Sequence, residues 1–104
     1  MSAHPAFNVD GCRWGTAAWD AGAERKRAHQ VQVAKGRTSL ENLPWNDPLW
    51  LPVLVEEVGE IARALNDREP LGQLRAEAVQ VAAMALAYAD AIQEAMEAEA
   101  SEND

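Results

Sequence analysis

Cysteine is nearly absent from this sequence, since Cys12 is the only one in 104 residues. A single thiol cannot close a disulfide within the chain, and a lone cysteine near an N-terminus is more often incidental than catalytic. Glycine-rich phosphate loops, dinucleotide-binding fingerprints and nucleophile elbows are missing too. The common sequence motifs for nucleotide binding and for acyl transfer are therefore absent. The low cysteine content fits the reducing cytoplasm.

Long apolar runs and metal-binding histidines are also missing. The longest uncharged stretch, residues 78–89, is shorter than the about 20 residues that a membrane-spanning helix needs. The first residues lack a basic region followed by an apolar run, so we predict no signal peptide and no membrane association. His4 and His29 show no metal-ligand spacing. We expect both histidines to be incidental surface residues, and no zinc site.

Positive charge is scarce, with nine Lys and Arg against seventeen Asp and Glu, for a formal charge of −8. Repulsion from phosphates argues against general nucleic-acid binding, and no recognition helix is apparent. The charge is uneven, at +3 over residues 1–37 and −11 over residues 38–104. An acidic half can gather a divalent cation and a basic half can meet phosphate, although a solvated surface explains the asymmetry as simply.

Helical patterns cover most of the chain, and no strand signal competes with them. Residues 16–35 are rich in helix-forming side chains and stop before Gly36, a residue type favoured just after a helix end. Residues 37–47 contain turn formers and a proline, which predicts a loop or a broken single turn. A short first helix therefore leads through a loop into the rest of the chain.

Two longer helices are predicted after this loop, over residues 52–66 and 71–99, with a proline-containing break between them. Asp47 and Pro48 resemble an N-cap followed by proline at the first helical position. Pro52, however, would lack a backbone donor in an unbroken helix from that point. The regular helix is therefore expected to begin near Pro52.

The predicted fold is all-α, a helical hairpin with a shorter first helix. We expect a flexible arm at residues 1–16, one helical domain at 17–99 and an acidic tail at 100–104. Alanine recurs along the last helix and keeps it slim, which favours close antiparallel packing. Its Ala/Met/Tyr face would be exposed to solvent in a monomer, so we expect a homodimer or tetramer of the four-helix-bundle type. A self-sufficient three-helix bundle is the alternative.

Acidic residues lie beside the apolar stripe of the second helix. At about 100° per residue, that stripe comprises Trp50, Leu54, Val58, Ile61 and Leu65. Glu57 lies next to it and Glu60 follows one turn later, so both carboxylates can reach one cation. Glu56 is also near Glu60, although a solvated helix face or a pairing with Arg63 explains Glu56 alone.

Glu77 lies within the apolar face of the last helix, among Leu74, Val81, Met84 and Tyr88. A buried carboxylate is costly without a partner, so Glu77 needs a cation, a proton or an arginine such as Arg63 or Arg75. Acids on two neighbouring helices suggest one shared acidic pocket, which like-charge repulsion destabilises unless a cation binds. Oxygen-only donors favour Mg²⁺ or Mn²⁺.

The last two predicted helices carry a motif pair that resembles a known family. The segments LVEEVGEIARAL (54–65) and LRAEAVQVAAMALAYADAI (74–92) are similar to the MazG-like all-α nucleotide pyrophosphatases, whose signature is EExxE, a gap and then ExxD. The matching residues are Glu56, Glu57, Glu60 and Glu77. Gln80 stands where the family usually has a metal-ligating aspartate.

The resemblance implies hydrolysis of a nucleoside triphosphate between its α and β phosphates, which gives a nucleoside monophosphate and pyrophosphate. It implies Mg²⁺, or Mn²⁺, held by Glu57, Glu60 and Glu77, with Gln80 as a possible neutral ligand. Glu56 would be the general base. A catalytically silent MazG-like module that binds a nucleotide or a partner protein is the alternative, and Gln80 favours it.

Substrate-binding residues are expected on the first helix and among the aromatic residues. The candidates for the phosphates, if the first helix lies over the acidic pocket, are Arg25, Lys26, Arg27 and Lys35, although a solvated basic face explains them as simply. The candidates for contact with the nucleobase are Trp45, Trp50 and Tyr88. Packing in the core is the commoner role for such rings.

Overall fold

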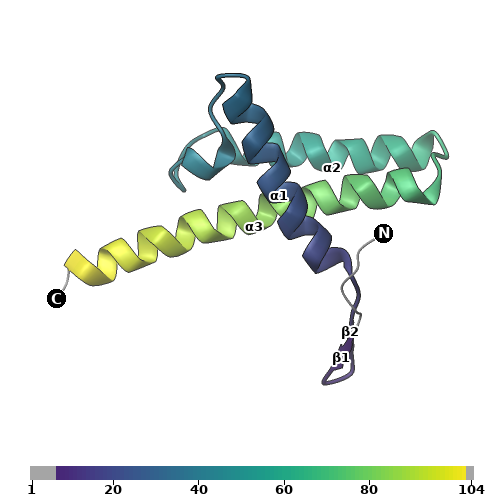
Figure 1. Ribbon diagram of the computed structural model, residues 1–104, viewed down its shortest axis with the longest axis horizontal. Coiled ribbons are helices and arrows are strands. Elements are labelled where there is room, and N and C mark those ends of the chain that lie inside the picture. The colour runs from purple at the N-terminus through teal and green to yellow at the C-terminus, as the bar shows by residue number, and fades with distance from the viewer. Residues whose placement is uncertain (1–6, 103–104) are drawn as a thin grey trace.

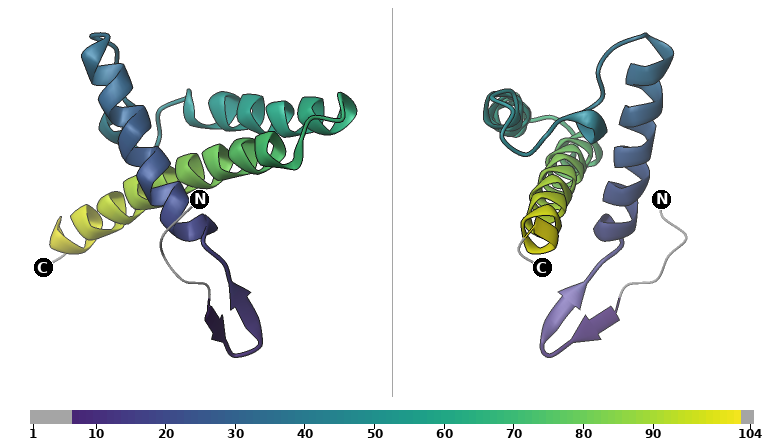
Figure 2. Two further views of the ribbon diagram at one scale, coloured as in Figure 1. Left: turned by 45° about the vertical axis from the view of Figure 1, so that its right-hand side comes forward. Right: turned by 90° about the vertical axis from the view of Figure 1, so that its left-hand side faces the viewer.

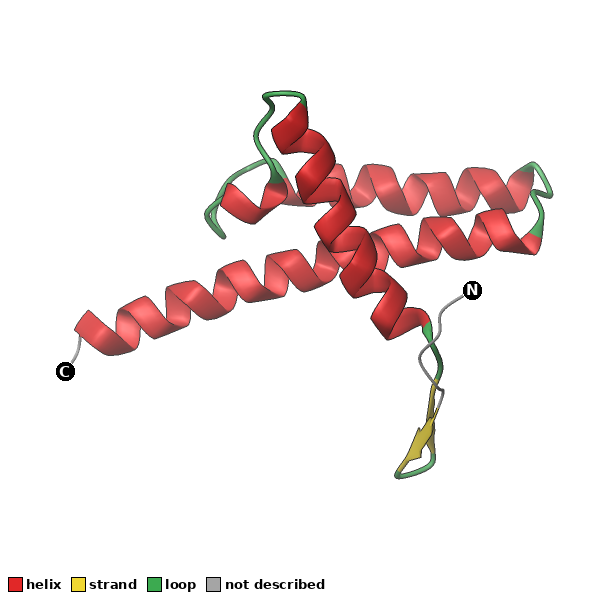
Figure 3. Cartoon of the chain, in the orientation of Figure 1, coloured by secondary structure: helices red, strands yellow, loops and turns green. Residues whose placement is uncertain are grey.

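Helices make up most of the computed structural model, which describes residues 7–102 (Figures 1 and 3). Its elements are β1 (Phe7–Val9), β2 (Cys12–Trp14), α1 (Ala17–Ala34), η1 (a 3₁₀ turn, Leu40–Asn42), α2 (Trp50–Asn66) and α3 (Leu71–Glu102). The all-α prediction is confirmed. Among the described residues, no helix combines the length and the apolar character that crossing a membrane requires.

The long helix α3 is the centre of the molecule. The shorter helix α2 runs antiparallel beside it, and α1 crosses α3 on another side (Figures 1 and 2). The turn η1 also packs against α3. The predicted antiparallel helical hairpin is therefore observed. The first helix is not shorter than both hairpin helices, since α1 has 18 residues and α2 has 17.

The end of α1 follows the predicted glycine signal. Gly36 has a φ of +68°, which a glycine adopts without steric cost. Its N–H donates to the Val33 carbonyl at 3.0 Å, and the Arg37 N–H donates to the Gln32 carbonyl at 2.9 Å. These two bonds are the Schellman pattern that satisfies the last carbonyls of a helix, so the chain turns sharply here into the loop that carries η1.

The start of α2 differs from the prediction by two residues. The helix begins at Trp50, and the Asp47 carboxylate Oδ1 accepts the Leu49 backbone N–H at 2.9 Å. Pro52 is the third residue of the helix, within the first turn, where the backbone N–H groups have no acceptor inside the helix anyway. The proline therefore does not prevent helix formation. The N-cap is Leu49 rather than Asp47, so Pro48 is not the first helical residue.

A β-hairpin in the N-terminal segment corrects the prediction of a flexible arm without strands. Phe7 pairs with Trp14 across the two strands, and their rings stack with centroids 6.2 Å apart. Asp10 and Gly11 between the strands both have positive φ, +48° and +80°. An Asp-Gly pair is a strong signal for such a tight turn, and the sequence prediction overlooked it. Residues 1–6 of the expected arm lie outside the described part.

The expected acidic tail is shorter than predicted, because α3 continues to Glu102. Residues 100–102 therefore belong to the helix rather than to a tail. Alanine, serine and glutamate in this stretch do not interrupt a helix. Residues 103–104 of the expected tail lie outside the described part of the chain.

The core is thin. Only five hydrophobic residues are buried within the described part of the chain: Ala21, Trp50, Ala64, Ala83 and Ala87. Small side chains on α1 and α3 allow these helices to cross closely. The Trp50 ring stacks on Tyr88 with centroids 5.0 Å apart, and its indole N–H donates to the Pro44 carbonyl at 2.8 Å. This pair joins α2 to α3.

Helix α2 has two apolar stripes, whereas the sequence predicted one. The inward stripe comprises buried or half-buried residues: Trp50, Leu54, Glu57, Ile61 and Ala64. The outward stripe comprises Leu51, Val55, Val58 and Leu65, which are 49 to 67% exposed. Val58 and Leu65 therefore do not belong to the core stripe, and Glu57 lies within that stripe rather than beside it.

We predict that Trp50→Ala lowers the free energy of unfolding by about 3 kcal/mol or more, as expected when a buried aromatic side chain is removed. Trp45→Ala is the matched control, since Trp45 is 48% exposed, and should change stability by less than about 1 kcal/mol. Urea unfolding followed by circular dichroism measures both values. Equal losses in the two variants would contradict the assignment of Trp50 to the core.

Candidate functional site

A pocket of about 400 Å³ lies between α1, the loop around η1, α2 and α3. This volume is typical of sites for small ligands. Its polar lining comprises Glu24, Arg25, Arg27, His29, Gln32, Thr38, Ser39, Glu41, Glu57 and Gln80. Its apolar lining comprises Ala28, Leu40, Leu43, Leu49, Val53, Ala83, Met84 and Ala87. Every helix contributes to the pocket, so its shape depends on how α1 crosses the hairpin.

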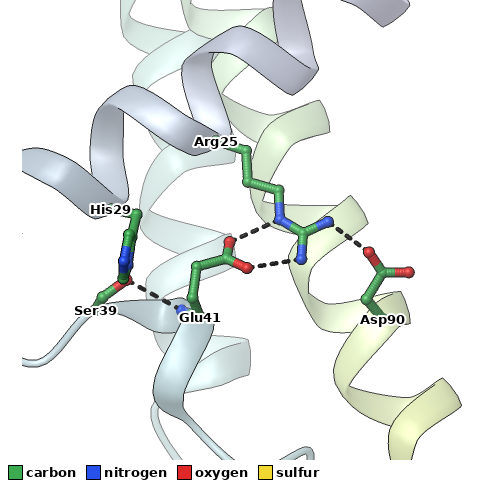
Figure 4. A network of polar contacts seen from close by, with 5 residues as sticks. All are labelled: Arg25, His29, Ser39, Glu41 and Asp90. Atoms are coloured by element: carbon green, nitrogen blue, oxygen red, sulfur yellow. Dashed lines mark hydrogen bonds and ion pairs between the residues drawn. The ribbon is translucent and has the colours of Figure 1, made fainter.

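Arg25 of α1 holds one wall of this pocket together (Figure 4). Its Nε and its second terminal nitrogen donate to the two carboxylate oxygens of Glu41, both at 2.7 Å, and its other terminal nitrogen donates to Asp90 at 2.5 Å. The bond to Glu41 is the main cause that raises the Arg25 pKa above its usual value. Because two carboxylates already engage this guanidinium, it ties α1 to η1 and α3.

Ser39 and His29 form a second polar contact between the loop and α1. Ser39 is 2% exposed, and its hydroxyl oxygen lies 2.7 Å from the His29 Nδ1. The same Ser39 oxygen accepts the Glu41 backbone N–H at 3.2 Å, which caps η1. His29 is half-buried. The prediction that His29 is an incidental surface residue is therefore wrong, because the residue lines the pocket and is held in place.

Glu57 is the carboxylate that reaches the pocket from α2. Its Oε2 is fully buried and has no hydrogen-bond partner within the described residues. Burial is the main cause that raises the pKa of this carboxyl above its usual value, and the negative charges of Glu77, Glu56, Glu60 and Glu24 raise it further. A buried, unpaired acceptor surrounded by like charges is the arrangement that a bound cation would stabilise.

The neighbouring carboxylates have only weak partners. Glu60 lies 3.8 Å from Arg63 on its own helix, and Glu77 accepts a 2.8 Å hydrogen bond from Gln73, also on its own helix. Glu77 makes no ion pair with Arg63 or Arg75, since Arg75 instead donates to Asp20 and Thr16. Such exposed pairs contribute little stability and exchange readily.

The donor set fits a hard cation in its chemistry. Glu57 offers an unpaired carboxylate oxygen, and Glu60 and Glu77 could turn away from weak partners. In the described part of the chain, no three Asp, Glu, His or Cys side chains converge on one point. A cation would therefore have to draw Glu60 and Glu77 toward Glu57.

The structure brings some of the predicted site residues together and leaves others apart. Glu57, Gln80 and Arg25 line the pocket, whereas the other predicted site residues do not: Lys26, Lys35, Trp50, Glu56, Glu60, Glu77 and Tyr88. Lys26, Lys35 and Glu56 are exposed. Trp50 is buried against Tyr88, so these two rings are packed as core residues, and Arg25 is engaged by carboxylates.

Sequence reasoning missed several residues of the pocket. Ser39 and Glu41 could have been found, because a serine just before a short acidic turn is a capping signal. His29 and Gln32 lie three residues apart on α1, on the same helical face as Arg25, and this periodicity would have grouped them. Glu24 was missed as well. It lines the pocket and pairs with Arg27, which had been expected near the phosphates; this pairing lowers the pKa of Glu24 and raises that of Arg27.

We predict that Glu57→Gln stabilises the metal-free protein at neutral pH and that this gain disappears in acid. A carboxyl whose pKa is raised by folding does not oppose folding below its unfolded pKa, and it opposes folding increasingly as the pH rises through the folded pKa. Removing this buried charge should raise the melting temperature at pH 7 by roughly 4 °C, the shift for about 1 kcal/mol.

The test compares melting temperatures in EDTA from neutral pH down to the ordinary glutamate pKa of about 4.3. Glu56→Gln is the control, because the Glu56 side chain is exposed and its loss should have a much smaller effect. A Glu57→Gln protein that melts below wild type at every pH would contradict the unpaired state of this carboxylate.

Comparison with known proteins assigns no family to this geometry. No protein-family model, no curated protein and no solved structure matches the chain. The likeness of residues 54–65 and 74–92 to the MazG-like pyrophosphatases therefore stays an expectation from the sequence. The function has to be argued from the contacts, burial and charge of the pocket itself.

Proposed function

We propose that the protein is a Mg²⁺-dependent nucleoside triphosphate pyrophosphohydrolase that acts in the cytoplasm on free nucleotides. The observation that carries the proposal is the unpaired, buried oxygen of Glu57 in a pocket of about 400 Å³. A pocket of this size can enclose a small ligand. Its charged lining comes from α1, from the loop around η1 and from α2. The motif pair around Glu57 and Glu77 points to the same chemistry.

Glu57, Glu60 and Glu77 would hold the cation, with the Gln80 amide oxygen as a neutral fourth donor. When bound, Mg²⁺ supplies positive charge beside the phosphate oxygens. Glu56, on the neighbouring position of α2, would accept a proton from the attacking water. The oxygen of that water bonds to the α phosphorus, and the bond from the α phosphorus to the bridging oxygen breaks, so that pyrophosphate leaves.

Arg27 is the cation best placed to meet the phosphates. It lines the pocket, and its present partner Glu24 lies one turn away on the same helix. A polyphosphate offers a guanidinium several charged oxygens in a geometry that suits paired hydrogen bonds. Lys26 and Lys35 are exposed outside the pocket, where they can attract a polyanion without holding it.

We propose further that the protein is a homodimer or tetramer of the four-helix-bundle type. The residues of the outward stripe of α2, defined above, follow helical spacing and are exposed, and Leu86 and Met96 of α3 are also 45% and 56% exposed. A surface of this kind on a thin hairpin is typical of an interface between subunits. The second candidate function, a silent nucleotide-binding or protein-binding module, is favoured only by Gln80.

We predict that wild type releases pyrophosphate from nucleoside triphosphates only with Mg²⁺ or Mn²⁺. Glu57→Gln, Glu60→Gln and Glu77→Gln should each reduce the rate by at least about 100-fold while the fold is retained, because each removes a charged ligand. Glu56→Gln should slow turnover yet keep metal binding. Gln80→Asp should tighten metal binding, because a carboxylate binds Mg²⁺ better than an amide.

The assay is pyrophosphate release across a panel of ribo- and deoxynucleoside triphosphates, with metal titrations for each variant. Glu99→Gln serves as the control, since it changes an acid near the C-terminal end of α3. If wild type hydrolyses none of the triphosphates but still binds nucleotides, the silent-module interpretation replaces the enzymatic one.

We predict that Val58→Lys converts the oligomer into monomers at micromolar concentration, because a charge in the middle of the outward stripe of α2 cannot be buried without a partner. Ala62→Ser, on the same helix, is the mild control and should leave the oligomer intact. Light scattering coupled to size-exclusion chromatography gives the masses. A wild-type protein that is monomeric under these conditions would contradict the proposed assembly.

A further inference from the structure

The tautomer of His29 follows from the hydrogen bonds of Ser39. The Ser39 oxygen accepts the Glu41 backbone N–H at 3.2 Å, and its only other partner within the described residues is the His29 Nδ1 at 2.7 Å. Because Ser39 is 2% exposed and no other described residue accepts from its hydroxyl, we infer that its one hydrogen is donated to Nδ1. Neutral His29 then carries its proton on Nε2.

The Nε2–H is the group that His29 can offer to a ligand. His29 lines the pocket, and no described residue takes up its second ring nitrogen. Gln32 lies one turn further along α1 on the same face, also lines the pocket, and its side-chain amide makes no hydrogen bond to a described residue. Together they present a fixed donor beside an amide that can both donate and accept.

The surrounding side chains suit a flat ring. The apolar lining near the loop and the start of α2 includes Leu40, Leu43, Leu49 and Val53, with Met84 from α3. Glu57 and Gln80 contribute the acidic and amide groups of the same pocket. If the phosphates lie near Glu57, as proposed above, the apolar lining is left for the nucleobase.

We propose that His29 is a specificity-determining residue that donates from Nε2 to a carbonyl oxygen of the nucleobase, while Gln32 pairs with the adjacent ring N–H. This inference rests on the proposed function for the position of the phosphates. A carbonyl beside a ring N–H occurs in uracil, thymine and guanine. Adenine has no carbonyl oxygen, so the pocket selects an oxo base over adenine. Ser39 is a positioning residue that fixes the tautomer.

Calorimetric titration with UMP and with AMP tests this directly, since neither requires hydrolysis. Wild type should bind UMP about ten-fold more tightly than AMP, the effect of one well-made hydrogen bond. His29→Ala should lose that preference by weakening UMP binding alone. His29→Phe, which keeps a ring of similar size, should do the same if His29→Ala folds poorly. Glu99→Gln, an exposed change on α3 outside the pocket, should leave the preference intact.

The role of Ser39 has its own readout. Ser39→Ala should reduce the UMP preference and Ser39→Thr, which keeps the hydroxyl, should restore it. A purely structural role would lower UMP and AMP binding equally, and that result would overturn the positioning role.

Three results would overturn the inference about His29. They are an unchanged UMP preference in both His29 variants, no binding of UMP by wild type, and weaker binding of inorganic phosphate by His29→Ala, which would place His29 on the phosphates. If UMP preference depends on His29 yet no triphosphate is hydrolysed, the proposed function fails and this inference stands. If triphosphates are hydrolysed but the UMP preference is unchanged in the His29 variants, the inference about His29 fails and the proposed function stands.

Discussion

The unpaired carboxylate of Glu57 is the constraint on which the rest of the account depends. It lies on the inward stripe of α2, where helix packing would favour an apolar side chain, and its buried oxygen finds no donor within the described residues. Folding therefore places a group there that water would otherwise solvate, at a cost in stability. Groups with such perturbed pKa values cluster at functional sites, and the surrounding acids are the reason that we propose a cation as the ligand.

The crossing of α1 over α3 completes the pocket around that carboxylate. Arg25 joins α1 to η1 and to α3 through Glu41 and Asp90, so one guanidinium connects the loop wall to two helices. Ser39, bound to His29, fixes the same loop a second time. With few buried apolar residues, these polar contacts contribute order that the thin core does not supply, and a partner subunit on α2 would contribute more.

The helical architecture could be predicted from the sequence because local signals determine it. Gly36 marks the end of α1, and alanine-rich spacing with a proline break marks the hairpin of α2 and α3. The local signal at Asp10 and Gly11 was also present, but it was overlooked in favour of an unstructured arm. The first two residues of α2 were missed because Pro52 was treated as a helix breaker rather than as a first-turn residue.

The site could be predicted only in part. Glu57 was identified because a charge beside an apolar stripe is visible in the sequence. Which of the two stripes of α2 faces α3 depends on tertiary packing, however, so Val58 was placed in the core by mistake. The partners of Arg25 are 16 and 65 residues away in the chain, and no periodicity reveals such contacts. The role of His29 depends on its contact with Ser39 in the loop, which the sequence does not reveal.

Thermal melting of wild type and Glu57→Gln, each in EDTA and in Mg²⁺, tests the central claim most directly. If Glu57 is a cation ligand that folding leaves unpaired, Mg²⁺ raises the melting temperature of wild type, since a ligand that binds only the folded state stabilises it. The same Mg²⁺ should then leave Glu57→Gln unchanged. Equal Mg²⁺ responses in the two proteins, or no response in wild type, would contradict the account.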